Sequence, residues 1–225
     1  MLYRWYSTPT LGKIARELTD AQLERALRHG VASNGRALDE MPSYFMYYID
    51  DADLSDIIAY LRSLPPVEHP TSTVAYGPLA RLQILLGYDL LGYGGPYPIG
   101  PFSADSMNHN APRYPASATD PEAEGSYLAH SICSECHGVD LHGGVADPPV
   151  DPTVPPDLAI VQAYSREDFG KLLNGGIGLG GRKLSLWMTE VGQNRTPHLT
   201  EEEVSDLYAY LHQLAPGKPH ANHGT

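Results

Sequence analysis

Four segments of the chain combine a stripe of apolar residues at helical spacing with a recognisable cap at the start. The first stripe contains Leu23, Ala26 and Leu27, and it follows a capping box made by Thr19 and Gln22. The other three helices are expected to begin at Asp50 or Asp51, at Ser165 with Asp168, and at Thr200 with Glu203. Glycine or proline follows each stripe and predicts where each helix ends.

A fifth helix is expected over Ala123 to Cys133. Gly125 and Ala129 lie one turn apart there, so another helix can cross closely, and the helix that begins at Thr200 is the expected partner. No stretch alternates between apolar and polar residues over a useful length, so few or no strands are expected. The sequence therefore predicts a mainly α fold.

The chain contains an internal duplication. Residues 18–36, LTDAQLERALRHGVASNGR, align with residues 164–182, YSREDFGKLLNGGIGLGGR, at an offset of about 146. Met41 then falls against Met188, one residue away from that offset. LSDIIAYLRSL at 54–64 finally matches VSDLYAYLHQL at 204–214. The second and fourth predicted helices are thus copies, as are the first and third.

This pattern divides the chain into four parts. We expect a partial copy over residues 1–64 and a complete copy over 121–215. Between them, residues 65–120 are rich in Pro, Gly, Tyr and Ser, which predicts a long irregular linker with one short helix around Leu79 to Leu91. Residues 216–225 are expected to form a flexible tail.

Composition and charge exclude some classes of function. Charged residues make up 19% and apolar residues 42%, a soluble profile, and the 20 prolines and 22 glycines predict many loops. The net charge of -12 opposes binding to nucleic acid or to anionic membranes, and suits either plain solubility or a basic docking partner. No run reaches the roughly 18 apolar residues of a membrane helix, so we do not expect the chain to span a membrane by itself.

The chemistry of the chain concentrates in Cys133-Ser134-Glu135-Cys136-His137. In a C-x-x-C-H motif, two thiols one helical turn apart can form thioethers to the vinyl groups of haem, and the adjacent imidazole can bind the iron. A redox-active C-x-x-C would need a strand before it and a helix after it. A zinc site would need two further ligands, for which His130 and His142 are the candidates.

The residues around this motif resemble the class I cytochrome c family, and specifically its two-domain, dihaem bacterial members. The matching residues of the second copy are GSYLAHSICSECHGVDLHGG, PPDL at 155–158, LLNGGIGLGGRKLSLWM and HLTEEEVSDLYAYLHQL. The resemblance covers essentially the whole chain. It implies a cytochrome c-like helical domain with one covalent haem c, attached to Cys133 and Cys136 and ligated by His137.

The resemblance also implies that Met188 binds the iron opposite His137. A thioether favours ferrous iron, so His/Met ligation raises the reduction potential and suits an electron carrier. Met188 could instead fill a core. His198 is the competing sixth ligand, but it directly precedes the Thr200 cap and is expected to be an ordinary residue at a helix start. His130 and His142 are expected to lie on the surface.

The N-terminal copy lacks a C-x-x-C-H segment. The offset places its expected first cysteine roughly thirteen residues before Met1. The copy is then either haem-free, with Met41 and Met46 in a core, or completed by a partner polypeptide or an upstream segment, with Met41 as ligand of a second haem. Without a first helix, the apolar face of α-helical residues Leu54, Ile57, Ile58 and Leu61 would be exposed, which favours a partner or a missing segment.

The expected function is transfer of single electrons between a redox protein donor and a redox protein acceptor, without enzymatic activity. The alternatives are a peroxidase-like haem enzyme and a structural subunit of a multihaem redox complex. Covalent haem attachment normally takes place outside the cytoplasm, so a periplasmic or other extracytoplasmic location is expected. The N-terminal residues MLYRWYSTPTLGK contain no recognisable signal peptide.

Overall fold

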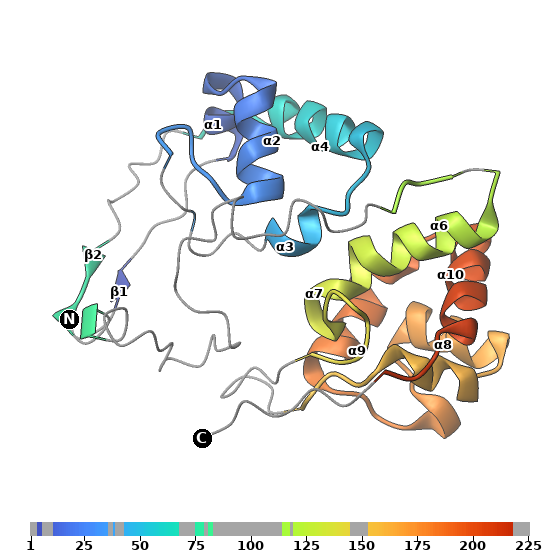
Figure 1. Cartoon of the computed structure of the whole chain (residues 1–225). Coiled ribbons are helices and arrows are strands. Elements are labelled where there is room, and N and C mark those ends of the chain that lie inside the picture. Colours follow the sequence, from blue (N-terminus) through green and yellow to red (C-terminus); the bar gives the residue numbers. More distant parts are fainter. Residues whose placement is uncertain are drawn as a thin grey trace. The chain divides into compact units, whose positions relative to one another are not determined.

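A computed structural model describes residues 4–5, 11–35, 38, 43–67, 75–78, 81–82, 114–117, 119–144 and 153–217. The chain divides into two compact units, Met1–Pro112 and Arg113–Thr225 (Figure 1). Three predictions fall outside the described residues: Met41 as a ligand, nearly all of the helix around Leu79 to Leu91, and the tail from residue 218 onward.

Unit 1 contains four described helices and a pair of very short strands. They are β1 (Arg4–Trp5), α1 (Leu11–Glu17), α2 (Asp20–His29), α3 (Ser43–Met46), α4 (Asp51–Ser63) and β2 (Ala75–Tyr76). The two strands pair antiparallel. The capping box of Thr19 with Gln22 begins α2, Gly30 ends it in the left-handed region at φ 63°, and Asp50 caps α4. These two helices were predicted, whereas α1 and α3 were not.

The core of unit 1 lies where α1, α2 and α4 meet. Its buried apolar residues are Ala15, Leu23, Ile49, Leu54 and Ile58. The expectation that Leu54 and Ile58 would be exposed is therefore wrong, because α1, which the sequence pattern did not reveal, packs with α2 against them. Ile57 and Leu61 are only half-buried, so this edge of α4 is less well covered.

Unit 2 is built from helices and helical turns. They are α6 (Pro121–Leu128), η1 (Ala129–Cys133), α7 (Ser134–His137), η2 (Leu158–Ala163), α8 (Arg166–Gly175), η3 (Leu179–Gly181), α9 (Leu186–Asn194), η4 (Thr196–His198) and α10 (Glu201–Gln213). The caps at Ser165 and Thr200 are present, and Thr200 with Glu203 forms the predicted capping box. The mainly α fold class is confirmed, while α9 was not predicted.

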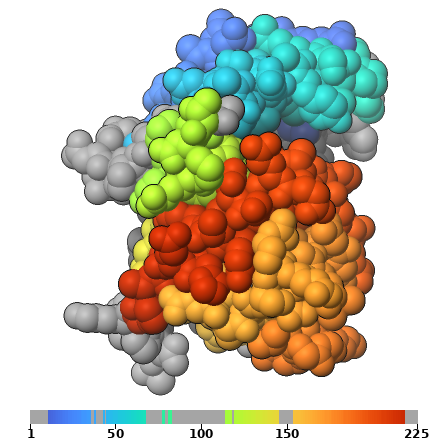
Figure 2. Space-filling model, turned by 90° about the vertical axis from the view of Figure 1, so that its right-hand side faces the viewer, coloured from blue at the N-terminus to red at the C-terminus, as the bar shows by residue number. Residues whose placement is uncertain are grey.

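Helices α6 and α10 cross closely and form the centre of unit 2. Figure 1 shows them side by side, and Figure 2 shows the red surface of α10 between the yellow-green start of α6 and the orange region of α8 and α9. A Cβ added at Gly125 would collide with the backbone carbonyl of Asp206 and approach the Cβ of Tyr210 to 2.8 Å. The predicted crossing through Gly125 is thus confirmed.

The interior of unit 2 is apolar and closed. Phe169, Leu141, Leu207 and Leu211 are almost fully buried in one cluster with residues of α6 and η2. Leu141 adopts a positive φ of 64°, which costs a residue with a side chain free energy, and its burial at 0% exposure offsets that cost. None of the described helices combines the length and hydropathy that crossing a membrane requires.

A similar hydrogen bond occurs in both units, upstream of the residues that match in sequence. In unit 1, Arg16 of α1 donates a hydrogen bond to the carbonyl oxygen of Leu64 at 3.1 Å. In unit 2, Gln162 of η2 donates to the carbonyl oxygen of Leu214 at 2.6 Å. Arg16 and Gln162 are separated by the same offset as Gly30 and Gly176. Helix α1 and the turn η2 thus make similar hydrogen bonds to the residue that follows the last described long helix of their own unit.

Candidate haem-attachment site

The C-x-x-C-H residues lie at the end of one continuous helical segment. Cys133 ends the turn η1, and Cys136 and His137 follow on α7. Both cysteines are unpaired thiols, with Cys133 half-buried and Cys136 exposed. Gly138 then ends the helix at φ 80°, a backbone conformation that glycine adopts without strain. The segment thus presents two thiols and an imidazole within one turn.

The turn η1 is π-helical, a feature that widens the helix just before the motif. Buried serines satisfy carbonyls along this segment: the hydroxyl of Ser131 donates to the carbonyl of Tyr127 at 2.8 Å, and that of Ser134 to the carbonyl of His130 at 2.5 Å. Single π-turns inside α-helices occur frequently at functional sites. Here the π-turn ends at Cys133, the first residue of the motif.

The tautomer of His137 follows from its hydrogen bond. Its Nδ1 atom lies 2.8 Å from the carbonyl oxygen of Pro156. A carbonyl only accepts, so Nδ1 carries the hydrogen and Nε2 keeps a lone pair for a metal. Burial lowers the pKa of His137, against the opposing effects of the Pro156 hydrogen bond and of Asp157. Burial thus favours the neutral form of the imidazole, and the hydrogen bond to Pro156 orients the ring as an iron ligand must be.

Backbone contacts hold the segment of Pro156 against the motif. Gly144 donates to the carbonyl oxygen of Pro155 at 3.1 Å, and Gly143 donates to that of His137 at 2.9 Å. A Cβ at Gly144 would collide with the carbonyl oxygen of Cys136, so only glycine permits this approach. The two segments on either side of the histidine are thereby held in contact.

Asp157 connects three parts of unit 2. Its carboxylate accepts hydrogen bonds from the backbone N–H of Ala159 at 2.8 Å and of Gly217 at 2.8 Å. It also pairs with Nδ1 of His142 at 3.2 Å. Burial raises the pKa of Asp157, but the two backbone hydrogen bonds and His142 together outweigh it and leave the pKa below its usual value. Asp157 thus holds the backbone directly after Pro156 in place. This role was not predicted from the sequence.

The rival chemistries of the motif lack structural support. Burial, with a smaller effect of Cys136, raises the pKa of Cys133 to about 12. Desolvation by neighbouring atoms, with a smaller effect of Glu135, raises the pKa of Cys136 even though this residue reaches the surface. Such thiols are protonated at neutral pH, whereas a reactive C-x-x-C needs a thiolate. A helix and not a strand precedes the motif. Within the described residues, no three His, Cys, Asp or Glu side chains gather as a metal site.

The remaining candidate ligands occupy different positions. Met188 lies in the first turn of α9, half-buried, with its N–H donating to the hydroxyl of the cap Ser185 at 3.3 Å. Its role as the sixth ligand stays a prediction. His198 is exposed in η4, as expected of an ordinary residue. The surface location expected for His130 is wrong: it is 4% exposed and stacks on Tyr114 at a centroid distance of 3.6 Å.

Exposed apolar residues lie beside the predicted haem-binding residues in the sequence, as a large apolar cofactor requires. Ile132 directly precedes Cys133, Val139 follows Gly138, and both are more than 40% exposed. Trp187, next to Met188, is also exposed. Porphyrin burial would remove such side chains from water. Together with two thiols and a neutral imidazole, these residues fit a covalently attached haem.

Residues 122–215 match the family model of cytochrome c. This part of the chain, which runs from α6 to α10, is similar to a cytochrome c domain. Such a domain implies a covalently bound haem c and a general role in carrying electrons. No curated protein matches the chain significantly. The family match includes all the residues predicted to attach or ligate the haem, from Cys133 to Met188.

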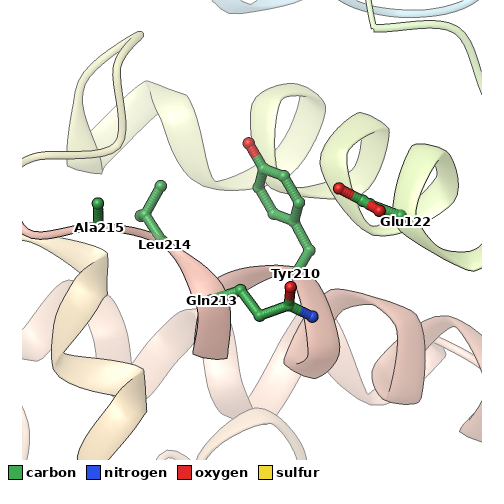
Figure 3. A pocket seen from close by; sticks show the side chains of 5 residues that line it. All are labelled: Glu122, Tyr210, Gln213, Leu214 and Ala215. Carbon is green, nitrogen blue, oxygen red and sulfur yellow. The ribbon is translucent and has the colours of Figure 1, made fainter.

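A shallow hollow between α6 and α10 is separate from this site. It is lined by Glu122, Tyr210, Gln213, Leu214 and Ala215 (Figure 3). None of these residues belongs to the C-x-x-C-H segment or hydrogen-bonds to His137. The hollow instead marks the outer edge of the crossing between the two helices.

Proposed function

We propose that the chain is a c-type cytochrome that transfers single electrons between a redox protein donor and a redox protein acceptor, through one haem c attached to Cys133 and Cys136. The observation that supports it most is the hydrogen bond from Nδ1 of His137 to Pro156, because it orients a neutral imidazole with Nε2 available for iron. A haem bound there supplies an iron that exchanges one electron between its ferric and ferrous states.

The protein contributes attachment, orientation and exclusion of water. The two thiols would attach the macrocycle, and His137 would ligate the iron from one side. Pro156 and the anchor at Asp157 would keep the imidazole from rotating. We further propose Met188 as the ligand on the other side, since a neutral thioether keeps both oxidation states six-coordinate and leaves no open position for a substrate.

The proposal also includes the organisation and location of the chain. We infer a partial cytochrome c-like copy over residues 1–64, a linker over 65–120 and a complete domain over 121–215, with extracytoplasmic maturation because haem attachment normally takes place there. The duplication supports the copies. Fractionation of the source cells tests the location: most of the haem-bearing chain is expected outside the cytoplasm.

The decisive experiment is to express the chain in a host with cytochrome c maturation machinery and to measure its intact mass and pyridine haemochrome absorbance. We expect the mass of one chain plus one haem, and haem that survives denaturing electrophoresis. A haem-free chain with both thiols open to alkylation would contradict the proposal.

The axial ligand has a test of its own. The ferric protein is expected to show the weak near-infrared band of sulfur-to-iron ligation and to bind cyanide slowly. Met188→Leu should abolish the band, while Met46→Leu, at a methionine packed in the core of unit 1, should preserve it. Persistence of the band in Met188→Leu, or its loss in His198→Ala alone, would refute Met188 as ligand. Rapid cyanide binding by the unmodified chain would favour a peroxidase-like enzyme.

A further inference from the structure

Helix α10 is followed by a short segment, residues 214–217, that folds back along η2 and is fixed at both ends (Figure 1). At one end, the carbonyl oxygen of Leu214 accepts a hydrogen bond from the side chain of Gln162 in η2 at 2.6 Å. At the other end, the N–H of Gly217 donates to the carboxylate of Asp157, the residue that caps the start of η2, at 2.8 Å. We call residues 214–217 the strap.

The strap packs on the ring of His142, which lies in the loop after the C-x-x-C-H segment. A Cβ added at Gly217 would collide with Cγ of this ring and lie 2.5 Å from its Nδ1 and Cδ2 atoms. No side chain fits at such distances, so the backbone of Gly217 lies directly against the imidazole. Nδ1 of the same ring lies 3.2 Å from the carboxylate of Asp157. His142 is therefore held between the strap and Asp157.

Asp157 gathers donors from three segments of unit 2. Its carboxylate accepts from the N–H groups of Ala159 and Gly217, each at 2.8 Å, and from Nδ1 of His142. A carboxylate only accepts, so Nδ1 of His142 carries a hydrogen whether the imidazole is neutral or protonated. The side chains of Asp157 and His142 are only 28% and 22% exposed, which protects these charge-assisted hydrogen bonds from competition by water. The contact thus does not depend on the charge of His142.

Asp157 shares a planar peptide unit with the carbonyl that orients His137. The carbonyl of Pro156 accepts from Nδ1 of His137 at 2.8 Å, and the nitrogen of that same peptide unit belongs to Asp157. On the far side of Asp157, the N–H of Leu158 donates to the carbonyl oxygen of Leu141 at 2.9 Å. Holding Asp157 in place therefore fixes the direction of the Pro156 carbonyl.

We propose that Gly217 of the strap and His142 are positioning residues for the iron ligand: by holding Asp157, they keep the Pro156 carbonyl on Nδ1 of His137 and thereby lower the reduction potential of the haem. A ligating imidazole becomes more basic when its other N–H donates to a carbonyl, and a more basic ligand stabilises ferric iron. The inference rests on the proposed haem at this site, although neither positioning residue touches the iron ligand itself.

Two substitutions test this role in the haem-loaded full chain. Gly217→Ala should push the strap and the His142 ring apart, and His142→Ala should remove the ring between them. We expect each variant to raise the reduction potential. Each should also accelerate exchange of the His137 Nδ1 proton with solvent, measured by NMR of the ferrous protein, about fivefold, the factor that corresponds to one net hydrogen bond.

Two further variants serve as controls. His212→Ala removes an exposed histidine of α10 that lies shortly before the strap, and it should change neither the potential nor the exchange rate. His142→Asn should recover most of the lost protection, because the asparagine amide can donate to Asp157 where Nδ1 did. Equal effects of His142→Asn and His142→Ala would show that the hydrogen bond to Asp157 has no part in the coupling.

The double variant tests the contact between the two positioning residues. The three atoms nearest to a Cβ at Gly217 all belong to His142. In a chain that already carries His142→Ala, Gly217→Ala should therefore have little further effect on the potential. Such non-additivity is the signature of residues in direct contact, whereas effects that add would overturn the proposal.

Haem attachment is measured first, on the same preparations. An unmodified chain that contains no haem would refute the proposed function. A haem-loaded chain would overturn the role of the strap alone if Gly217→Ala and His142→Ala kept the potential and the Nδ1 exchange rate of the unmodified chain. A lowered potential in both variants would also overturn it, because a weaker hydrogen bond at His137 must raise the potential.

Discussion

Gly125 of α6 lies against the backbone carbonyl of Asp206 on α10, at a place where no Cβ fits. Because helix backbones resist displacement, Gly125→Ala should force α6 and α10 apart. We expect a loss of about 1–3 kcal/mol in the free energy of unfolding, measured by denaturant titration of the haem-loaded chain.

A second glycine of the same unit supplies the control. A Cβ at Gly170, inside α8, would meet only the end of the Arg166 side chain at 3.5 Å. Gly170→Ala should therefore stabilise unit 2 by about 0.5–1 kcal/mol through helix propensity. Equal effects of the two substitutions would show that the α6–α10 crossing is not as close as described.

Asp157 should make the stability of unit 2 depend on acid pH. Its pKa is lower in the folded chain than the ordinary value of 3.8. The carboxylate's contribution is therefore fully present above that ordinary value and is lost as the pH falls through the lowered pKa. Asp157→Asn should flatten the acid side of the curve of unfolding free energy against pH.

Asp157→Ala should be the more damaging variant. It leaves the N–H groups of Ala159 and Gly217 without their side-chain acceptor, whereas asparagine keeps one acceptor oxygen. We expect about 0.5–2 kcal/mol of destabilisation at neutral pH, as for loss of a helix cap. If the slope of unfolding free energy against pH on the acid side is unchanged in both variants, the pH dependence arises from another carboxylate.

Arg28 should be important to the stability of unit 1. It is 4% exposed on α2, and it donates to the carbonyl oxygen of Ile49 at 2.8 Å and to Asp51 at 2.6 Å. Asp51 is largely exposed, so its ion pair contributes little. The main loss in Arg28→Ala should come from the carbonyl of Ile49 and the buried stem of the side chain, about 1–3 kcal/mol.

The readout must separate the two units. Hydrogen exchange of the α2 and α4 amides should accelerate in Arg28→Ala, while exchange in α6 and α10 stays unchanged. Arg28→Lys should recover only part of the protection, since an ammonium group cannot reproduce the contacts of the guanidinium with Glu24, Ile49 and Asp51. Full protection in Arg28→Lys would show that charge alone is required.

Complete covalent attachment of the haem should require both thiols. Cys133→Ala and Cys136→Ala should each leave a single thioether, and the double variant should contain no haem that survives denaturing electrophoresis. These are the only cysteines of the chain, so no other thiol can substitute. Covalent haem in the double variant would contradict the assigned motif.

The sequence by itself predicted the features that depend on neighbouring residues. The boxes of Thr19 with Gln22 and of Thr200 with Glu203 mark helix starts, because a cap bonds to a backbone group three residues away. C-x-x-C-H likewise needs only one helical turn to bring its thiols together. The lack of a side chain at Gly125 also correctly predicted a close crossing of two helices.

Only the tertiary structure decided the features that depend on residues far apart in the chain. The partner of His137 is a carbonyl nineteen residues away, and any residue could have supplied one. Burial of His130, the anchor at Asp157 and the cover that α1 gives Leu54 likewise arise from packing between segments. Local patterns encode hydrogen bonds within a turn, whereas long-range contacts depend on how the whole apolar surface is buried.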